Sequence, residues 1–230
     1  MTEQEYMLKR ESYRKKALSL MESGVNFVDL DSVYIDDEVQ IGKGTFVGPC
    51  VTLEGNTFIG ENCAIYQNTR IVDSKIASGT TVQSSVILSS EVGENTSVGP
   101  FAYIRPGSKI GNDCKVGDFV EVKNSTMGDG TKSAHLTYIG DADLGKNINL
   151  GCGVVFVNYD GSNKHRSTVG DGAFIGCNSN IVSPVEIGKG AYIAAGTTVT
   201  EDVPDDAMAI GRSKQENKQN WSKEKGLYRK

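Results

Sequence analysis

The chain has 230 residues and a net charge of −5 at pH 7, with 29 acidic against 24 basic residues. Nucleic-acid-binding proteins usually carry an excess of Lys and Arg, so this acidic balance argues against that class. No apolar run is long enough to span a bilayer, and no signal peptide opens the chain. We therefore expect a cytoplasmic protein that binds neither nucleic acid nor membrane.

The five cysteines and two histidines do not predict a metal site. No CxxC pair is present, which argues against structural zinc. A site made of three histidines fails because only His135 and His165 are available. Cys63 and Cys114 fall at positions where the repeat described below calls for a small buried residue, a place that suits a free thiol. We expect no metal to be required.

Residues 3–23 are predicted to form a helix, within an N-terminal segment that covers residues 1–24. The larger apolar residues fall near one face of this helix, namely Tyr6, Tyr13, Ala17, Leu20 and Met21. Gly24 follows as a C-cap residue, because glycine adopts the left-handed conformation that ends many helices.

An aliphatic residue returns every six positions across most of the remaining chain. Three unbroken runs show this period: Ile35, Ile41, Val47, Leu53, Ile59, Ile65 and Ile71; Val92, Val98, Ile104, Ile110, Val116 and Val122; Val169, Ile175, Ile181, Ile187, Ile193 and Val199. A period of six divides by two, so each repeat can be a short strand with its aliphatic residue inward. Such repeats stack into a solenoid, which predicts an all-β parallel β-helix over residues 25–204.

Short steps of five residues interrupt the period without losing the inward register. They run from Ile71 to Ile76, from Val82 to Ile87 and from Ile87 to Val92. If three repeats make one coil, residues about 18 apart stack on one face, about 4.8 Å apart.

Arg105 and Lys123 have this spacing, and each follows an inward residue. Stacked cations repel each other unless an anion lies between them, which indicates a phosphate site. The alternative is an ion pair with Glu121 or Asp118.

His135 lies two positions past an inward position, so we expect it at a corner of the coil near Arg105 and Lys123. It is either an ordinary surface residue or a proton acceptor that works near neutral pH. Cys152 is expected at the same corner one coil further on. A Cys152–His135 nucleophile pair lacks a carboxylate at a clear spacing to orient the imidazole, which argues against covalent catalysis.

The repeat breaks between Phe156 and Val169, where residues 158–166 are polar and rich in turn-forming residues. We expect a loop over residues 157–168 that leaves the coil. Loops on a rigid scaffold are where binding chemistry concentrates.

Residues 205–230 are expected to form a basic C-terminal arm. From Arg212 onward, seven Lys or Arg against two Glu give +5, so the rest of the chain carries −10. The arm is either a solvated end or a cationic segment for a phosphorylated ligand. Ser213 and Glu216 form a capping box, which predicts a short helix bearing Trp221, the only tryptophan.

Several long motifs resemble one bacterial enzyme family. They are GPFAYIRPG at 99–107, FVEVKNS at 119–125, HLTYIGDA at 135–142, NYDGSNK at 158–164 and IAAGTTVT at 193–200, with VTLEGN at 51–56 in the earlier coils. Residues 99–221 are similar to the acetyltransferase half of the bifunctional enzyme that joins an N-acetylglucosamine-1-phosphate uridyltransferase to a glucosamine-1-phosphate N-acetyltransferase. Residues 24–98 resemble its early coils, and the N-terminal helix resembles the connector to the uridyltransferase half.

The resemblance implies a left-handed β-helix, a homotrimer with sites between subunits, and a role for each matched residue. Those implied to hold the sugar phosphate are Arg105, Lys123 and Lys164; those that contact or cover the sugar are Tyr138, Asn149, Asn158 and Tyr159. His135 matches the general base. Ala195 and Arg212 match contacts to acetyl-CoA, which is the implied co-substrate.

Two cysteines depart from the family pattern beside the acetyl-CoA contacts. Cys152 stands where the family usually has Ala, and Cys177 stands where it usually has Ser. A backbone N–H survives a change of side chain, so Cys152 can still stabilise an oxyanion. The bulkier thiols put the fit of the acyl group in question.

The sequence therefore predicts an acetyl-CoA-dependent N-acetyltransferase that acts on an amino-sugar 1-phosphate, foremost glucosamine 1-phosphate, in UDP-N-acetylglucosamine and cell-wall precursor synthesis. Two alternatives stay open: a β-helix acyltransferase for another amino sugar or nucleotide sugar, and a non-catalytic trimeric β-helix subunit. No Gly-rich nucleotide-binding signature precedes the helix, so we expect no uridyltransferase activity. That step is left to a separate uridyltransferase partner, unless the chain uses a different amino-sugar phosphate.

Overall fold

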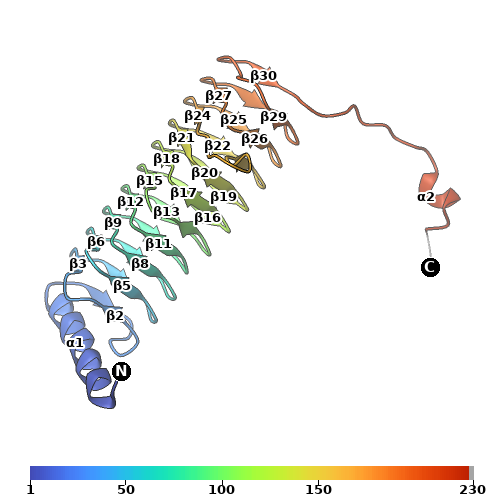
Figure 1. Ribbon diagram of the computed structural model, residues 1–230. Coiled ribbons are helices and arrows are strands. Elements are labelled where there is room, and N and C mark those ends of the chain that lie inside the picture. Colours follow the sequence, from blue (N-terminus) through green and yellow to red (C-terminus); the bar gives the residue numbers. More distant parts are fainter. Residues whose placement is uncertain (228–230) are drawn as a thin grey trace.

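The computed structural model describes residues 1–227, which form one elongated solenoid with a helix at one end and an extended arm at the other (Figure 1). The predicted all-β, left-handed parallel β-helix is confirmed. Strands of two to four residues alternate among three parallel sheets, so each coil is a triangle whose sides are one strand each.

Within residues 1–227, the three sheets contain eleven, ten and nine strands. Sheet A contains β1 (Asn26–Phe27), β4 (Phe46–Val47), β7 (Ala64–Ile65), β10 (Thr81–Val82), β13 (Ser97–Val98), β16 (Lys115–Asp118), β19 (Lys132–His135), β22 (Asn149–Leu150), β25 (Phe174–Ile175), β28 (Tyr192–Ile193) and β30 (Met208–Ala209). Sheet B contains β2 (Tyr34–Ile35), β5 (Thr52–Glu54), β8 (Arg70–Val72), β11 (Val86–Leu88), β14 (Tyr103–Ile104), β17 (Glu121–Lys123), β20 (Tyr138–Gly140), β23 (Val155–Val157), β26 (Asn180–Val182) and β29 (Thr198–Val199). Sheet C contains β3 (Gln40–Ile41), β6 (Phe58–Ile59), β9 (Lys75–Ile76), β12 (Glu91–Val92), β15 (Lys109–Ile110), β18 (Thr126–Met127), β21 (Ala142–Leu144), β24 (Ser167–Val169) and β27 (Glu186–Ile187).

The repeating aliphatic residues form the core, a narrow column inside the triangle. Ile71, Ile76, Val82 and Ile87 are all fully buried, so the predicted five-residue steps keep the inward register. Small inward residues line the corners and bind backbone carbonyls across coils; the Thr45 hydroxyl, for example, donates to Gly60 O at 2.8 Å. Cys63 and Cys114 are buried in the same slots, as the sequence predicts.

Two further five-residue steps, which the sequence analysis did not identify, shorten the coils in the middle of the solenoid. They run from Val122 to Met127 and from Ile139 to Leu144, and all four side chains are buried. The stacking partner of a residue there lies 17 positions away, as the pairing of Ser133 with Leu150 shows. This change of spacing decides which side chains meet at the site described below.

Helix α1 (Glu3–Glu22) forms where the sequence predicts a helix over residues 3–23, and it lies at the N-terminal end of the column (Figure 1). Thr2 and Glu5 form a capping box at its start, and Gly24 follows its end with a φ of +100°. Ala17 is buried against the first coil, and the Tyr13 ring meets the Tyr34 ring edge-on at 5.7 Å. The predicted apolar face is only partly covered, because Tyr6 and Met21 remain exposed. No helix within residues 1–227 is both long and apolar enough to cross a membrane.

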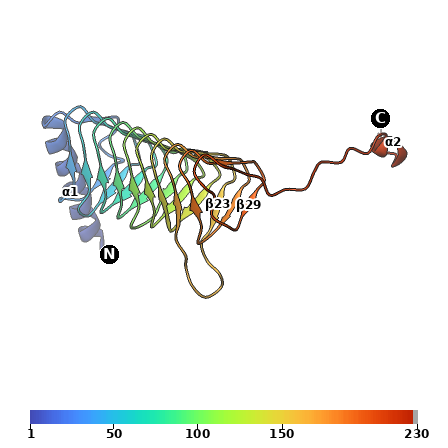
Figure 2. The same cartoon turned by 90° about the horizontal axis from the view of Figure 1, so that it is seen from above.

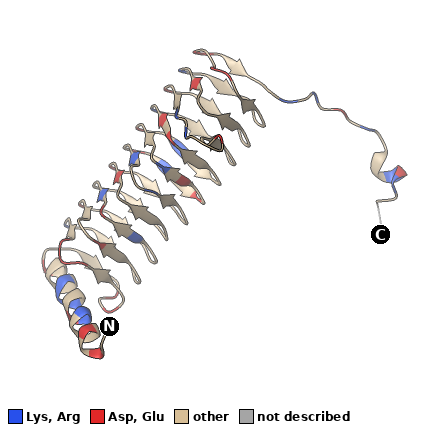
Figure 3. Cartoon of the chain, in the orientation of Figure 1, with Lys and Arg blue, Asp and Glu red and all other residues tan. Residues whose placement is uncertain are grey.

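The coil continues beyond the boundary expected at residue 204, since β30 pairs with β28. The arm then leaves the solenoid and carries a four-residue helix, α2 (Trp221–Glu224) (Figures 1 and 3). The predicted capping box at Ser213 and Glu216 is wrong, because α2 starts after Asn220 without a side-chain cap. A segment this short and polar has too little to bury to extend a helix toward Ser213. Two of the tail's seven cations, Arg229 and Lys230, lie outside the described residues.

Candidate active site

His135 and Asp118 form a hydrogen-bonded pair at the corner between sheets A and B. Parallel pairing of β16 with β19 sets Asp118 beside His135. The imidazole Nδ1 lies 2.7 Å from Asp118 Oδ1. This hydrogen bond holds the pKa of the Asp118 carboxyl below its usual value. If Nδ1 carries the proton that Asp118 accepts, Nε2 of the imidazole is free to accept another.

The expectation that no carboxylate orients His135 is wrong. A coil of about 18 residues does not bring Asp118 to His135, but the short steps make the local spacing 17, which is the spacing between these two residues. A register count that included the step from Val122 to Met127 would have found the partner. The pair is open to solvent, with 56% of the His135 side chain exposed.

Continuing the same corner toward the C-terminus gives a line of residues in register with His135. The pairing of Ser133 with Leu150 and of Leu150 with Ile175 sets Cys152 one coil beyond His135, and Cys177 one coil beyond Cys152. The next two pairings continue the line through Ala195 to the start of the arm. There the Arg212 guanidinium donates to the carbonyl oxygen of Ala195. His135, Cys152, Cys177 and Ala195 therefore lie in one line that ends at Arg212, and we call it the corner line. The last four of these five residues are those that the resemblance places beside the acyl donor.

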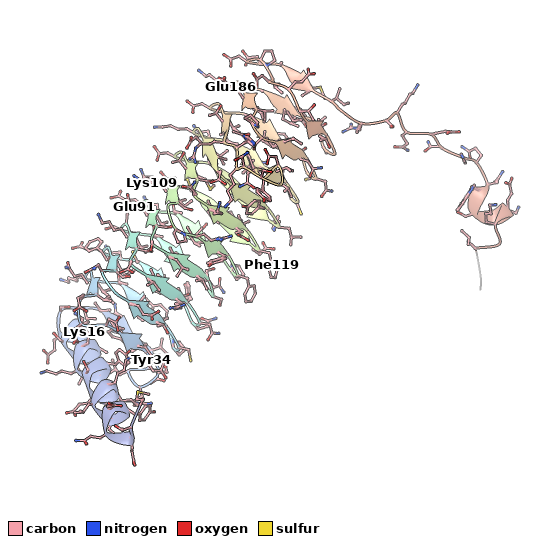
Figure 4. The ribbon with its side chains drawn as sticks, viewed as in Figure 1. Lys16, Tyr34, Glu91, Lys109, Phe119 and Glu186 are labelled. Atoms are coloured by element: carbon pink, nitrogen blue, oxygen red, sulfur yellow. The ribbon has the colours of Figure 1, made fainter. Side chains whose placement is uncertain are left out.

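An apolar ridge lies directly beside the His135–Asp118 pair. Phe101, Phe119 and Leu136 occupy the same corner in three successive coils, each with positive φ and each more than half exposed. The two Phe rings stack at 5.4 Å, and Phe119 projects outward from the corner (Figure 4). A non-glycine residue with positive φ is uncommon, and here it points a large apolar side chain into solvent.

Arg105 and Lys123 lie on the outward face of sheet B. Arg105 follows β14 directly, and Lys123 is the last residue of β17. Arg105 Nη1 lies 2.8 Å from Glu121 Oε1, so the ion pair weighed as an alternative does form for Arg105. Lys123 pairs with neither expected acid: its Nζ lies 3.0 Å from Oδ2 of Asp141. Burial favours the neutral amine of Lys123, but the hydrogen bond and charge of Asp141, together with other neighbours, outweigh burial and raise the pKa of Lys123.

Asp141 is a buried carboxylate that the sequence analysis missed. It lies at the corner between sheets B and C, 6% exposed, with a φ of +50°. It accepts hydrogen bonds from Lys123 at 3.0 Å, from the Asn124 amide at 2.6 Å and from the Asn158 amide. Burial alone would raise the pKa of Asp141, but these donors together hold it below its usual value. Asp tolerates the left-handed conformation, but Asp73 and Asp113 occupy such corners too, so nothing in the sequence singles out Asp141.

Lys164 joins Arg105 and Lys123 in one cationic cluster. It comes from the loop between β23 and β24, which stands out from the solenoid (Figure 2). The ammonium of Lys123 lies close enough to lower the pKa of Lys164, and the charge of Arg105 adds to this effect. The mutual repulsion is what a bound dianion such as a phosphate would relieve.

The loop at 158–166 is held in shape by its own contacts. Strands β23 and β24 extend to Val157 and from Ser167, so the loop is shorter than the predicted 157–168. Asp160 accepts backbone N–H groups and lies 2.7 Å from the His165 ring; these bonds hold the pKa of Asp160 well below its usual value. Arg166 anchors the loop base to Asp143 at 2.5 Å. Asn158 is buried at the base, whereas Tyr159, which pairs with Lys164 across the loop, is exposed.

The two implied sugar contacts lie on different faces. Tyr138 is on the outward face of sheet B, where its hydroxyl lies over Gly140, the register partner of Lys123. A side chain at position 140 would collide with this hydroxyl, since an added Cβ would lie 2.4 Å from it. Asn149 is on sheet A, between Lys132 and Phe174. One chain therefore brings Tyr138 to the cationic cluster but leaves Asn149 around the corner. No group of three His, Cys, Asp or Glu side chains in residues 1–227 is placed to hold a metal ion.

A comparison with protein families agrees with the repeat. The family described as bacterial transferase hexapeptide (six repeats) matches residues 89–124 and 166–201. A UDP-N-acetylglucosamine acyltransferase of Arabidopsis, known as a solved structure, is 20% identical with a TM-score of 0.49, over 77% of this chain and 69% of that one.

Curated relatives are much more similar in sequence. Bifunctional protein GlmU of Clostridium botulinum (strain Kyoto / Type A2) is 55% identical over 210 residues, which are 91% of this chain and 46% of the relative. Bifunctional protein GlmU of Clostridium beijerinckii is 57% identical over 207 residues, with 90% and 46% covered. The chain thus spans about half the length of these relatives. It is a hexapeptide-repeat homologue of the GlmU proteins that corresponds to one half of them.

Proposed function

We propose that this protein is a glucosamine-1-phosphate N-acetyltransferase that uses acetyl-CoA. The observation that carries the proposal is the placement of an Asp-oriented histidine and a three-cation cluster on neighbouring coils. His135 and Tyr138 are three residues apart, so their Cα atoms are separated by at most about 11 Å. Tyr138 in turn lies beside the cationic cluster. A sugar phosphate bound at Arg105, Lys123 and Lys164 would reach toward the corner where His135 stands.

In the proposed mechanism the amine of the sugar attacks the thioester carbonyl of acetyl-CoA. His135 Nε2 accepts the amine proton as the new C–N bond forms, and Asp118 holds the imidazole and stabilises its charged form. The C–S bond then breaks, and the CoA thiolate takes up a proton. The backbone N–H of Cys152 makes no hydrogen bond within residues 1–227, and it lies one coil from His135, so it is available for the oxyanion.

The corner line offers a path for the acyl donor. His135, Cys152, Cys177 and Ala195 stand on four consecutive coils, so the line spans three coil steps, or about 14 Å. It ends at Arg212, where the basic arm begins. A thioester placed at His135 would thus extend its pantetheine chain along the line and bring its phosphates to the arm. Acetyl-CoA fits this arrangement because an acetyl group needs little room beside Cys152.

Release of CoA thiol tests the proposed function. With acetyl-CoA and glucosamine 1-phosphate, purified protein should release thiol and form the N-acetylated sugar phosphate. Glucosamine without the phosphate should react far more slowly, because the cationic cluster would have no dianion to hold. Equal rates with both sugars would contradict the assignment of Arg105, Lys123 and Lys164 to a phosphate.

We also expect a homotrimer in solution, with each site completed by a second copy. One chain leaves Tyr138 and Asn149 on different faces, leaves His135 open, and exposes Phe101, Phe119 and Leu136 beside it. A neighbouring subunit packed along this ridge would bury the apolar side chains and form a wall of the site.

Light scattering after size-exclusion chromatography should give three times the chain mass. The matched variants Phe119→Ser and Phe58→Ser, the latter on an exposed position of sheet C, should differ: only the first should weaken assembly and activity together. A fully active monomer would contradict this expectation.

A further inference from the structure

Three free thiols remain outside the core, and two of them lie next to each other. Cys50, Cys152 and Cys177 reach the surface, whereas Cys63 and Cys114 are buried. Burial raises the pKa of the Cys63 and Cys114 thiols, which makes them poor nucleophiles. Cys152 and Cys177 are stacked on consecutive coils of the corner line.

The spacing of these two cysteines suits a disulfide. The paired strands β22 and β25 fix the register on one side, and the Asn178 N–H donates to Cys152 O at 2.8 Å on the other. Their Cα atoms are therefore about one strand spacing apart, roughly 4.8 Å. Disulfides bridge Cα atoms that are about 4.4 to 6.8 Å apart.

The Cys177 thiol turns back toward the coil that carries Cys152. Its Sγ lies 2.9 Å from where a side chain would begin at Gly151, the residue just before Cys152. Because Gly151 has no side chain, the backbone and the thiol of Cys177 both pack closely against it. Cys177 is exposed and Cys152 is half-buried, so an oxidant meets Cys177 first.

We propose that Cys152 and Cys177 are an oxidation site that forms a reversible disulfide across two coils beside His135. In the first step the Cys177 thiolate attacks a peroxide oxygen of hydrogen peroxide, giving a sulfenic acid and releasing water after protonation. In the second step the Cys152 thiol attacks the sulfenic sulfur, the S–S bond forms and a second water leaves. Two thiols thus lose two electrons and two protons, and hydrogen peroxide is reduced to two waters.

The disulfide would stop acyl transfer, an effect that rests on the proposed function. The corner line between His135 and Ala195 is the path assigned to the acyl donor, and the bridge would lie across it. It would also fix Cys152, whose N–H is assigned to the oxyanion. A thiol such as dithiothreitol would reverse the bridge by exchange. The pair is therefore a redox control on donor binding that sits at the site itself.

Peptide mapping tests the disulfide independently of activity. The full-length protein is treated with hydrogen peroxide, alkylated and digested with trypsin without reduction. Cleavage at Lys146, Lys164, Arg166 and Lys189 puts Cys152 in peptide 147–164 and Cys177 in peptide 167–189, with no other cysteine in either. The two peptides should run as one linked species that separates on reduction, and the count of free thiols should fall from five to three. Unlinked peptides, or oxidation confined to Cys177, would overturn the proposal.

Activity is then compared within each variant between its reduced and its oxidised form. The unmodified protein should lose at least ten-fold of its acetyl transfer on oxidation and regain it with dithiothreitol. Cys50→Ser, which changes the exposed cysteine far from the site, should respond in the same way. Cys177→Ser should form no linked species and lose no activity by this route.

If the linked species forms but neither the reduced nor the oxidised protein transfers acetyl groups, the proposed function fails while the oxidation site stands. If the linked species forms and activity is unchanged, the control role is overturned.

Discussion

Replacing His135 with Ala should lower kcat for acetyl transfer by about two to four orders of magnitude, the usual contribution of a general base. KM for the sugar phosphate should change little, because His135 lies at the corner before the sheet B strands, whereas the Lys123 end of the cationic cluster lies at the corner after them. The expected loss is large because the described site offers the amine no second imidazole: His165 lies in the loop and is bonded to Asp160. Steady-state kinetics across neutral pH would measure the effect. Near-normal kcat over that range would move the proton acceptor elsewhere.

Asp118→Asn is the matched test of how His135 works. The amide keeps the size of the side chain but can present an N–H to Nδ1, which favours the tautomer with its proton on Nε2. We expect kcat to fall while KM and the thermal unfolding temperature stay close to those of the parent. The pH dependence of kcat should also shift, because the Asp118 carboxylate no longer stabilises the imidazolium. A purely structural role for Asp118 would instead lower stability and leave the pH profile unmoved.

Replacing Lys123 with Ala should raise KM for the sugar phosphate by about ten-fold or more, the usual loss for a charge-assisted contact. The effect should exceed that of Lys164→Ala, because Lys123 also pairs with the buried Asp141. Without Lys123, the carboxylate would face the phosphate and repel it. Removal of one partner of a buried ion pair also costs stability, so thermal unfolding should begin at a lower temperature.

A second substitution separates these two contributions. Asp141→Asn in the Lys123→Ala background removes the uncompensated negative charge and should recover part of both KM and stability. It should not recover all, because the amide would point an N–H toward one of the donors from Asn124 and Asn158. Equal KM values for Lys123→Ala and Lys164→Ala, with no rescue, would show that Asp141 does not influence phosphate binding.

The fold could be predicted because one constraint repeats on every coil. Residues such as Ile104, Val122 and Val98 must point inward, and that demand is visible in the sequence as a period of six. The corner residues carry no such periodic constraint. Asp118 meets His135 at a spacing of 17, which a fixed spacing of 18 misses because a short step alters the coil length. Asp141 lies 18 residues from Lys123, but nothing periodic in the sequence marks this pair among the other acids and bases of the corners. The helix of the arm was harder to predict. Ser213 and Glu216 have the spacing of a capping box, but within the described residues nothing packs against the arm there to make a helix form.

Because the coils stack regularly, the number of coils between two residues sets the distance between them along the solenoid. Whole coils of 17 or 18 residues can be added or removed without turning any side chain to another face, as the pairings of Ser133 with Leu150 and of Ile175 with Ile193 show. One coil inserted between Cys152 and Ala195 would carry Arg212 about 4.8 Å further from His135 and keep both on the same edge. The number of coils between His135 and Arg212 therefore sets how long an acyl donor must be to contact both residues.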